Sequence, residues 1–221
     1  MSGQKELRIR RLFIAADLPD EARQAVAEEQ KRIASALRDE EHEPFPGHRS
    51  AKHEGGRRAA ALKWVKPDHA HLTLVFLGDV EETRVPAVVE AVGRDVDASP
   101  FEITLDTLGV FPPRGAPRVL WIGVGDGALS LSDLQRELAR RMAVLGIPLE
   151  DRPFHPHLTL ARWRESRSPD RDRALAVASH RVIARACVDG ATLYQSRVSP
   201  AGPSYTALAR ASLISVRGVR L

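Results

Sequence analysis

The sequence contains little that could support a disulfide framework, a thiolate metal cluster or a membrane anchor. Cys187 is the only cysteine among 221 residues, which excludes an intrachain disulfide and a four-thiolate zinc site within one chain, and we expect a buried, inert thiol. No run approaches the roughly 18 uninterrupted apolar residues that a membrane helix needs. The polar start at Met1 also lacks the apolar core of a secretory signal. We therefore predict a cytoplasmic protein that does not engage a membrane.

Aromatic residues and lysine are also scarce. Aromatic residues make up 5% of the chain, and arginine greatly outnumbers lysine within their combined count of 33. A hydrophobic content of 43% and a charged content of 28% are ordinary for a globular protein and exclude wholesale disorder. Because the arginine fork suits phosphate oxygens, a polyanionic ligand is compatible with the net charge of +4. On composition alone, a preference for arginine codons is the simpler explanation.

The hydrophobic pattern predicts one α+β domain that spans residues 1–221. Periodicity and end signals predict helices over residues 19–38, 81–96, 129–145 and 169–179. Alternating or apolar runs predict strands over residues 12–18, 62–65, 71–78, 101–110, 119–124, 154–161, 182–193 and 204–213. Residues 39–60 are rich in charge, proline and glycine, so we predict a flexible insertion there. Its irregularly spaced histidines, His42, His48 and His53, indicate a solvated loop and not a metal site.

Two of the predicted strands carry the same tetrapeptide, His-Leu-Thr-Leu, at residues 71–74 and 157–160. Successive side chains of a strand point to opposite faces, so His71 projects with Thr73, and His157 with Thr159. If an approximate twofold axis relates the two halves, both pairs face a common groove. One neutral histidine could then accept a proton from a nucleophile, while the other, protonated, donates one to the leaving oxygen. The duplication predicts acid–base chemistry at phosphorus, with threonine hydroxyls on the phosphate oxygens.

The segments around the two tetrapeptides resemble a known family. HLTLVFLG (residues 71–78) and FHPHLTLAR (residues 154–162) are similar to the two signature motifs of the 2H phosphoesterase superfamily. The likeness is to its RNA 2′,3′-cyclic phosphodiesterase branch, also called LigT-like or 2′-5′ RNA ligase proteins. RLFIAADLP (residues 11–19), LKWVKPDHAHLTL (residues 62–74) and SRVSPAGPSYTAL (residues 196–208) extend it over most of the chain outside the insertion.

This resemblance implies a fold, an activity and a set of site residues. The fold is bilobal, with two pseudo-symmetric lobes whose antiparallel sheets line a central groove and whose helices lie outside. The implied activity is hydrolysis of the 2′,3′-cyclic phosphate of RNA or a nucleotide to a 2′-phosphomonoester, without cofactor or metal. His157 would activate water, His71 would protonate the leaving 3′ oxygen, and Thr73 and Thr159 would hold the phosphate. The opposite assignment of the two histidines stays open, and we expect a monomer.

Arg162 matches a phosphate-contacting arginine of the second motif. Strict strand alternation, however, places Arg162 on the face opposite His157 and Thr159. The strand must therefore bend or end near Ala161 for Arg162 to join the site.

Metal binding is the main chemical alternative. Residues 69–71 and 155–157 form two His-x-His units, which could supply four imidazoles to zinc or copper. No carboxylate is repeated beside them, and the repeated threonines would have no role in such a site. Asp68 and Pro156 also indicate that His69 and His155 lie at the start of their strands.

Two further alternatives keep the fold and change the function. The first is a non-catalytic RNA-binding protein that uses aromatic side chains for base stacking. The aromatic residues considered for that role are Trp64, Phe76, Phe154 and Trp163. The second is 2′-5′ RNA ligation in the same groove, in which a 5′-hydroxyl replaces water.

Overall fold

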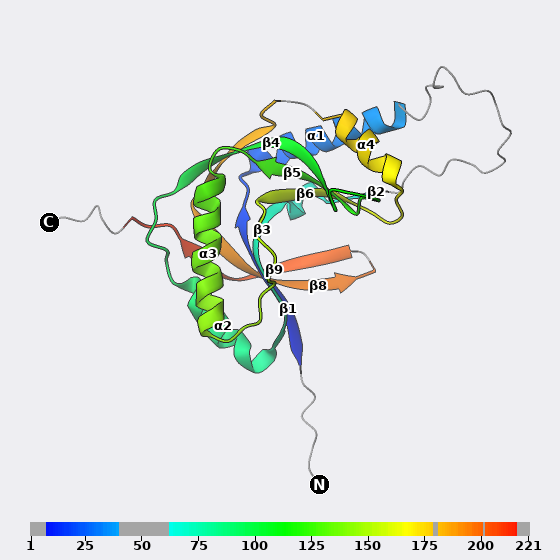
Figure 1. Ribbon diagram of the computed structural model, residues 1–221. Coiled ribbons are helices and arrows are strands. Elements are labelled where there is room, and N and C mark those ends of the chain that lie inside the picture. Colours follow the sequence, from blue (N-terminus) through cyan, green and yellow to red (C-terminus); the bar gives the residue numbers. More distant parts are fainter. Residues whose placement is uncertain (1–7, 40–61, 179–180, 201, 216–221) are drawn as a thin grey trace, which may run out of the picture.

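The computed structural model describes residues 8–39, 62–178, 181–200 and 202–215 (Figure 1). The predicted insertion at residues 39–60 and its three histidines lie outside the described residues, apart from the first position, which ends a helix. Within these ranges, no helix has the length and apolar content needed to span a bilayer.

Two antiparallel sheets, with helices outside them, form the described part of the chain. The first sheet has the order β3-β1-β8-β9 and consists of β1 (Ile9–Asp17), β3 (His71–Glu81), β8 (Gly190–Ser199) and β9 (Gly202–Ser212). The second has the order β2-β6-β5-β4-β7 and consists of β2 (Leu62–Trp64), β4 (Phe101–Phe111), β5 (Val119–Val124), β6 (His157–Trp163) and β7 (Ala184–Val188). The helices are α1 (Asp20–Asp39), α2 (Val85–Gly93), α3 (Ala128–Val144) and α4 (Ser168–Ala176), with 3-10 turns η1 (Pro67–His69) and η2 (Glu82–Arg84).

The predicted two-lobed α+β fold is confirmed, because the two sheets repeat one arrangement. β3 lies beside β1 and then β8, as β6 lies beside β5 and then β4, and a long helix follows β1 and β5. Each of these helices contacts the other lobe: α1 packs against β7, and α3 packs against β3 and α2 (Figure 1). The lobes are therefore joined by exchanged helices.

The leucines of both tetrapeptides lie in the hydrophobic core. Leu72, Leu158 and Leu160 are fully buried, and Leu74 is nearly so. Burial of one such side chain contributes about 1.5–3 kcal/mol to the free energy of folding. Burial of the leucines turns the opposite face of each strand toward the surface. The polar residues of the tetrapeptides lie on that outer face.

Two element predictions need correction. The segment 182–193 is not one strand, because the chain leaves the second sheet after β7 and joins the first sheet as β8 at Gly190. Buried apolar residues alternate at Ala184, Ala186 and Val188 and then shift to Ala191 and Leu193, so the alternation changes phase at this crossing. The helix predicted from residue 81 begins at Val85, because β3 continues to Glu81 as the partner of β1.

The prediction of a buried Cys187 is wrong, because its side chain is exposed on β7 between Ala186 and Val188, which point inward. The pKa of the thiol is nevertheless raised by desolvation and by the neighbouring Glu102 carboxylate. A raised pKa disfavours the reactive thiolate.

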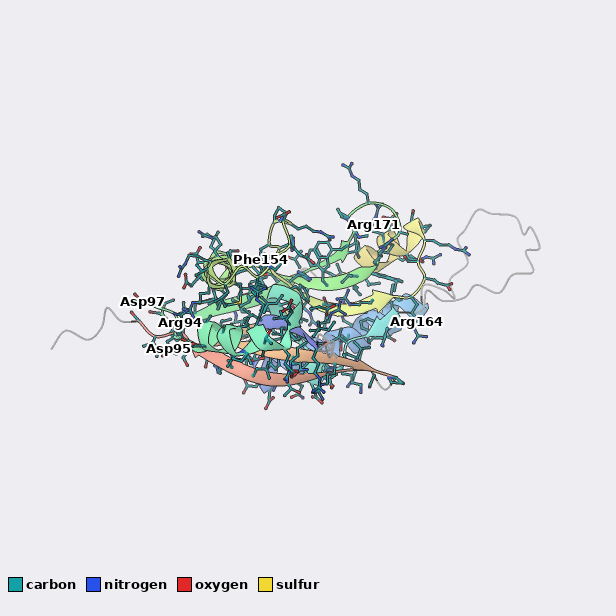
Figure 2. All side chains as sticks on the ribbon, turned by 90° about the horizontal axis from the view of Figure 1, so that it is seen from below. Arg94, Asp95, Asp97, Phe154, Arg164 and Arg171 are labelled. Atoms are coloured by element: carbon teal, nitrogen blue, oxygen red, sulfur yellow. The ribbon has the colours of Figure 1, made fainter. Side chains whose placement is uncertain are left out.

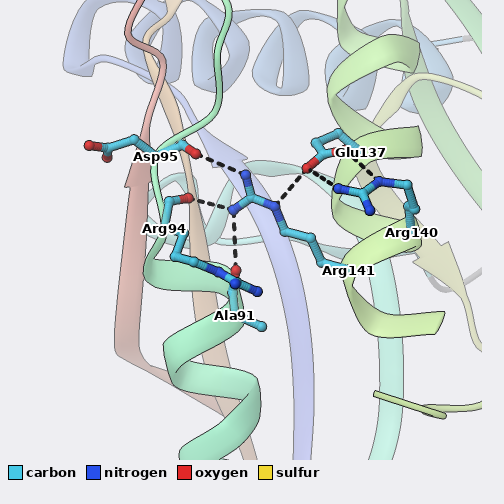
Figure 3. A network of polar contacts seen from close by, with 6 residues as sticks. All are labelled: Ala91, Arg94, Asp95, Glu137, Arg140 and Arg141. Carbon is cyan, nitrogen blue, oxygen red and sulfur yellow. Dashed lines mark hydrogen bonds and ion pairs between the residues drawn. The ribbon is translucent and has the colours of Figure 1, made fainter. Parts of the chain in front are cut away.

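The buried Arg141 ties α3 to the end of α2 (Figure 3). Its guanidinium donates to the carbonyl oxygens of Ala91, Arg94 and Asp95, and its Nε donates to Glu137 at 2.9 Å. The carbonyls that the helix end leaves without intrahelical partners are satisfied in this way.

Candidate active site

The predicted histidine and threonine pairs occupy equivalent places in the two lobes. His71 and Thr73 start β3, and His157 and Thr159 start β6. All four side chains are partly exposed, and the burial pattern of the seven residues from each histidine is identical. β3 and β6 also contact each other across the boundary between the sheets. The two pairs therefore lie at the junction of the lobes, on the face opposite the leucines.

Each histidine has one ring nitrogen fixed by its own chain. His71 Nδ1 lies 2.7 Å from the carbonyl oxygen of His69, and His157 Nδ1 lies 2.7 Å from that of His155. A carbonyl oxygen only accepts, so Nδ1 carries the proton in both neutral rings. Nε2 is then the nitrogen left to exchange a proton with a ligand.

A β-bulge resolves the position of Arg162. In the pairing of β5 with β6, Trp121 lies opposite Thr159 but Leu120 lies opposite Ala161, so Leu160 is an extra residue. Arg162 pairs with Val119, which shares a face of β5 with Trp121. Arg162 therefore projects with Thr159 and His157, as the family resemblance requires, and the strand does not end at Ala161.

The same bulge occurs in the other lobe. Ala15 lies opposite Thr73 and Ile14 opposite Val75, so Leu74 is the extra residue on β3. Phe76 consequently takes the place that Arg162 occupies in β6, and its side chain is 53% exposed. The two strands are thus equivalent in backbone and differ in chemistry at this one position.

The carbonyl group of Leu160, at the bulge of β6, accepts a hydrogen bond from α1. Gln30 is buried, and its Nε2 donates to the carbonyl oxygens of Leu160 and Val65, both at 3.0 Å. The Val65 N–H donates to the same Leu160 oxygen at 2.8 Å. A helix of one lobe thereby holds the backbone that positions Arg162 in the other.

The electrostatic environments of the two histidines differ. Desolvation is the main cause that lowers the pKa of both rings. The charges of His155 and Arg162 lower the pKa of His157 further, whereas the Asp17 carboxylate raises that of His71. At His71 the charge of His69 also lowers the pKa and the Asp17 carboxylate opposes the lowering, and both rings have a pKa below the ordinary value.

Asp17 was not identified from the sequence, although it ends the strand that pairs with β3. It lies directly opposite His71 in the β1–β3 register. Its carboxylate accepts hydrogen bonds from Thr192 Oγ1 and the Tyr194 hydroxyl, both at 2.7 Å. Burial, followed by this hydrogen bond and the Asp17 charge, raises the pKa of Tyr194 to about 12. Strand alternation places Asp17 on the same face of β1 as Phe13. This alternation is the sequence signal from which Asp17 could have been identified.

An aromatic cluster surrounds His71. The Phe13 ring stacks on the His71 ring with centroids 4.9 Å apart, and Tyr205 meets His71 edge-on at 5.4 Å. Desolvation raises the pKa of Tyr205, while the charge of Arg162 lowers it. Tyr205 belongs to the first sheet and Arg162 to the second, so this charge effect places the two polar faces near each other, as the contact between β3 and β6 does.

The aromatic residues considered for base stacking separate into two groups. Trp163 is buried, and Trp64 and Phe154 are partly buried against the core. Phe76 alone of the four lies on the histidine face. The other aromatic residues of that face were not identified from the sequence, and they are Phe13, Phe111, Trp121, Tyr194 and Tyr205.

The first histidine of each His-x-His unit precedes its strand. His69 ends η1, and His155 lies in the segment before β6. Within the ranges that the structure describes, no three His, Cys, Asp or Glu side chains are grouped so that they could hold a metal ion.

Two pseudo-symmetric antiparallel sheets, each presenting a His-x-Thr strand at their junction, define the two-histidine phosphoesterase class. The 2′-5′ RNA ligase superfamily matches residues 39–199, which is more than half of the chain. The chain belongs to this superfamily.

Curated relatives and solved structures agree with this assignment. An RNA 2′,3′-cyclic phosphodiesterase of Aquifex aeolicus is 36% identical over 146 residues, which cover 65% of this chain and 78% of the relative. One from Thermus thermophilus is 34% identical over 216 residues, covering 94% and 92%. The crystal structure of E. coli LigT complexed with 3′-AMP superposes with a TM-score of 0.64 at 29% identity, covering 93% of this chain and 99% of that one.

Proposed function

We propose that this chain hydrolyses the 2′,3′-cyclic phosphate of RNA or a nucleotide to a 2′-phosphomonoester, without a metal ion. The observation that carries the proposal is the matched pair of histidines, each with Nδ1 held by a carbonyl and Nε2 available beside a threonine. The activity named for the relatives and the nucleotide bound in the LigT structure support the same substrate class.

The proposed reaction is an in-line displacement at phosphorus. His157 Nε2 takes a proton from water as the water oxygen bonds to phosphorus. The bond from phosphorus to the 3′ oxygen breaks, and His71 Nε2 gives its proton to that oxygen. The product keeps its phosphate on the 2′ oxygen, and the histidines regain their starting states by proton exchange with solvent.

The assignment of base and acid follows from the charges near each ring. Arg162 lowers the pKa of His157 and so keeps it neutral, as a base requires. Desolvation lowers the pKa of His71, and the Asp17 carboxylate opposes that lowering, which is the charge that an acid at this position requires. An anionic phosphate between the rings would raise the pKa of both histidines. We assign the threonines and Arg162 to the nonbridging phosphate oxygens.

Ligation is the second candidate, and the name of the superfamily favours it. A 5′-hydroxyl would replace water, so the product would be a 2′-5′ phosphodiester with a free 3′-hydroxyl. Hydrolysis should dominate because water is the more abundant nucleophile. A monomeric state and a cytoplasmic location remain predictions.

The test uses adenosine 2′,3′-cyclic phosphate, purified protein and a chelator, with chromatographic separation of the 2′- and 3′-monophosphates. We expect the 2′-phosphate, and a roughly hundredfold to ten-thousandfold loss of kcat in His71→Ala and in His157→Ala. Circular dichroism would establish that the variants are folded. A folded variant of either histidine with near-normal turnover would refute the mechanism. A 3′-phosphate would refute the direction of ring opening, and no product would favour the non-catalytic RNA-binding alternative.

A further inference from the structure

The second sheet carries an aromatic surface that hydrolysis of a mononucleotide leaves without a role. Trp121 lies with its ring centroid 5.0 Å from that of Phe111, 4.8 Å from that of His155 and 6.1 Å from that of His157. We call Trp121, Phe111 and His155 the Trp121 surface. It borders the histidine assigned as the base.

The ring of Trp121 packs closely over two glycines of the second sheet. A Cβ atom at Gly109 would lie 2.2 Å from the ring, and one at Gly123 would lie 3.1 Å from it, so the indole rests where glycine leaves room. Its neighbours on β5, Leu120 and Ile122, are fully buried on the core face, so Trp121 faces the other way. Within the described part of the chain, the buried indole N–H has no hydrogen-bond acceptor, which is unfavourable for a group packed only as part of a core. Packing in the core therefore does not account for the placement of this ring.

Two cations lie on the same face of the second sheet as the Trp121 surface, because Phe111, Val119, Arg162 and Lys63 are paired in turn across neighbouring strands. Lys63 on β2 lies directly opposite Arg162 on β6, so both side chains share the histidine face, and both are exposed. Like charges opposite each other destabilise a strand pair. Among the described residues, neither side chain forms an ion pair with a carboxylate.

The positive charge continues past the end of β6. Arg164 is exposed there and likewise has no ion pair with a carboxylate among the described residues. In Figure 2, Arg164 lies at the end of the molecule away from Asp95 and Asp97. Aromatic rings beside unneutralised cations are the combination that binds bases and phosphates of single-stranded nucleic acid.

We infer that the Trp121 surface and Lys63 form a second nucleotide subsite, which binds the RNA nucleotide that carries an attacking 5′-hydroxyl. The inference rests on the proposed function. If His71 protonates the leaving 3′ oxygen, the ribose of the cyclic phosphate lies over the first sheet. The Trp121 surface lies on the opposite side, next to His157, from which the nucleophile approaches. The base of the incoming nucleotide stacks on Trp121, and its following phosphate lies near Lys63.

The joining step at this subsite is balanced in the same way as hydrolysis. The 5′ oxygen bonds to phosphorus and gives its proton to His157, while the 3′ oxygen leaves and takes a proton from His71. Joining and hydrolysis thus share every group except the nucleophile. The ratio of joined to hydrolysed product at a fixed acceptor concentration consequently reports on the acceptor, since changes common to both reactions cancel.

The experiment measures this ratio with adenosine 2′,3′-cyclic phosphate and adenosine as the acceptor. Trp121→Ala should lower the ratio about 5- to 150-fold, which corresponds to the roughly 1–3 kcal/mol of one base stack. Trp121→Phe should recover most of the loss. A wild-type protein that hydrolyses but never joins, or a ratio unchanged within about twofold in Trp121→Ala, would overturn the inference. A wild-type protein that does not hydrolyse at all would instead overturn the proposed function.

A second variant tests the phosphate contact and does not depend on how Trp121→Ala folds. Lys63→Ala should lower the ratio for the dinucleotide acceptor ApA, which has an internal phosphate, and the loss should shrink at high salt. Lys31→Ala, an equal charge change on the exposed side of α1, is the matched control and should leave the ratio unchanged. Equal effects of the two lysine variants would count against the subsite.

The nucleotide bound at the Trp121 surface could instead belong to the RNA strand that carries the cyclic phosphate. If Trp121→Ala slows hydrolysis of ApA ending in a 2′,3′-cyclic phosphate more than that of the mononucleotide, and leaves the joining ratio unchanged, the subsite holds the upstream nucleotide. That result would overturn the assignment to the acceptor.

Discussion

Replacement of Gln30 by methionine tests whether α1 sustains the bulge that brings Arg162 to the site. Methionine has nearly the same length and volume but donates no hydrogen bond. The variant would leave the Val65 carbonyl without its Gln30 partner, while the Leu160 carbonyl keeps the Val65 N–H. Nothing that touches a substrate is altered.

The expected loss can be worked from these contacts. Two hydrogen bonds at 3.0 Å, each with a net contribution of about 0.5–1.5 kcal/mol, give a loss of about 1–3 kcal/mol in the free energy of unfolding. Arg162→Ala removes the charged contact to phosphate that we propose, and such a contact is worth about 1.5–3 kcal/mol, which corresponds to a loss of roughly 10- to 150-fold in kcat/KM. We expect kcat/KM of Gln30→Met to lie between that of the wild type and that of Arg162→Ala.

Urea unfolding followed by circular dichroism gives the stability, and hydrolysis of adenosine 2′,3′-cyclic phosphate gives kcat/KM. Gln24→Met, a change of the same kind at an exposed position of α1, is the control and should shift stability by less than about 0.5 kcal/mol. A Gln30→Met variant that loses stability and keeps wild-type kcat/KM would contradict this role of α1, because the bulge would then hold Arg162 without it.

Three further predictions concern other contacts. Arg141→Met should lose about 3–5 kcal/mol of stability in urea unfolding, because Arg141 is a buried charge with several acceptors, whereas the exposed Arg140→Met should change little. Similar losses in both variants would contradict this. Asp17→Asn removes a charge that raises the pKa of His71, so the alkaline limb of the kcat/KM profile should move to lower pH; a shift of the acidic limb alone would reverse the assignment of the histidines. Tyr194 should titrate near its pKa of about 12, against about 10 when unfolded. Its contribution to stability is therefore present below pH 10 and lost as pH rises toward 12. An absorbance titration in which every tyrosine titrates normally would contradict this.

Local rules predicted the parts of the site that depend on strand parity. The pairing of His71 with Thr73 and of His157 with Thr159 follows from alternation, and the buried leucines between them confirm it. The two-lobed fold followed from the repeated motif and the family resemblance. Parity also showed that Arg162 requires an irregular strand.

The rest depends on contacts between distant segments. The extra residue at Leu160 appears only once β6 is paired with β5, and its support comes from Gln30, which lies 130 positions away in the chain. The change of sheet near Gly190 depends on which strand edges are free. Trp121 looks like an ordinary strand aromatic until Gly109 on the neighbouring strand is seen beneath it.

The exchange of helices between the lobes bears on how a ligand reaches the two histidines. α1 leaves the first sheet to cover the second, α3 leaves the second to contact the first, and the chain crosses again between β7 and β8. A hinge motion that separated the lobes would have to break all of these crossings together. We therefore expect a preformed distance between the histidines and a single cooperative unfolding transition, with ligand adaptation confined to exposed side chains such as Phe76 and Arg162.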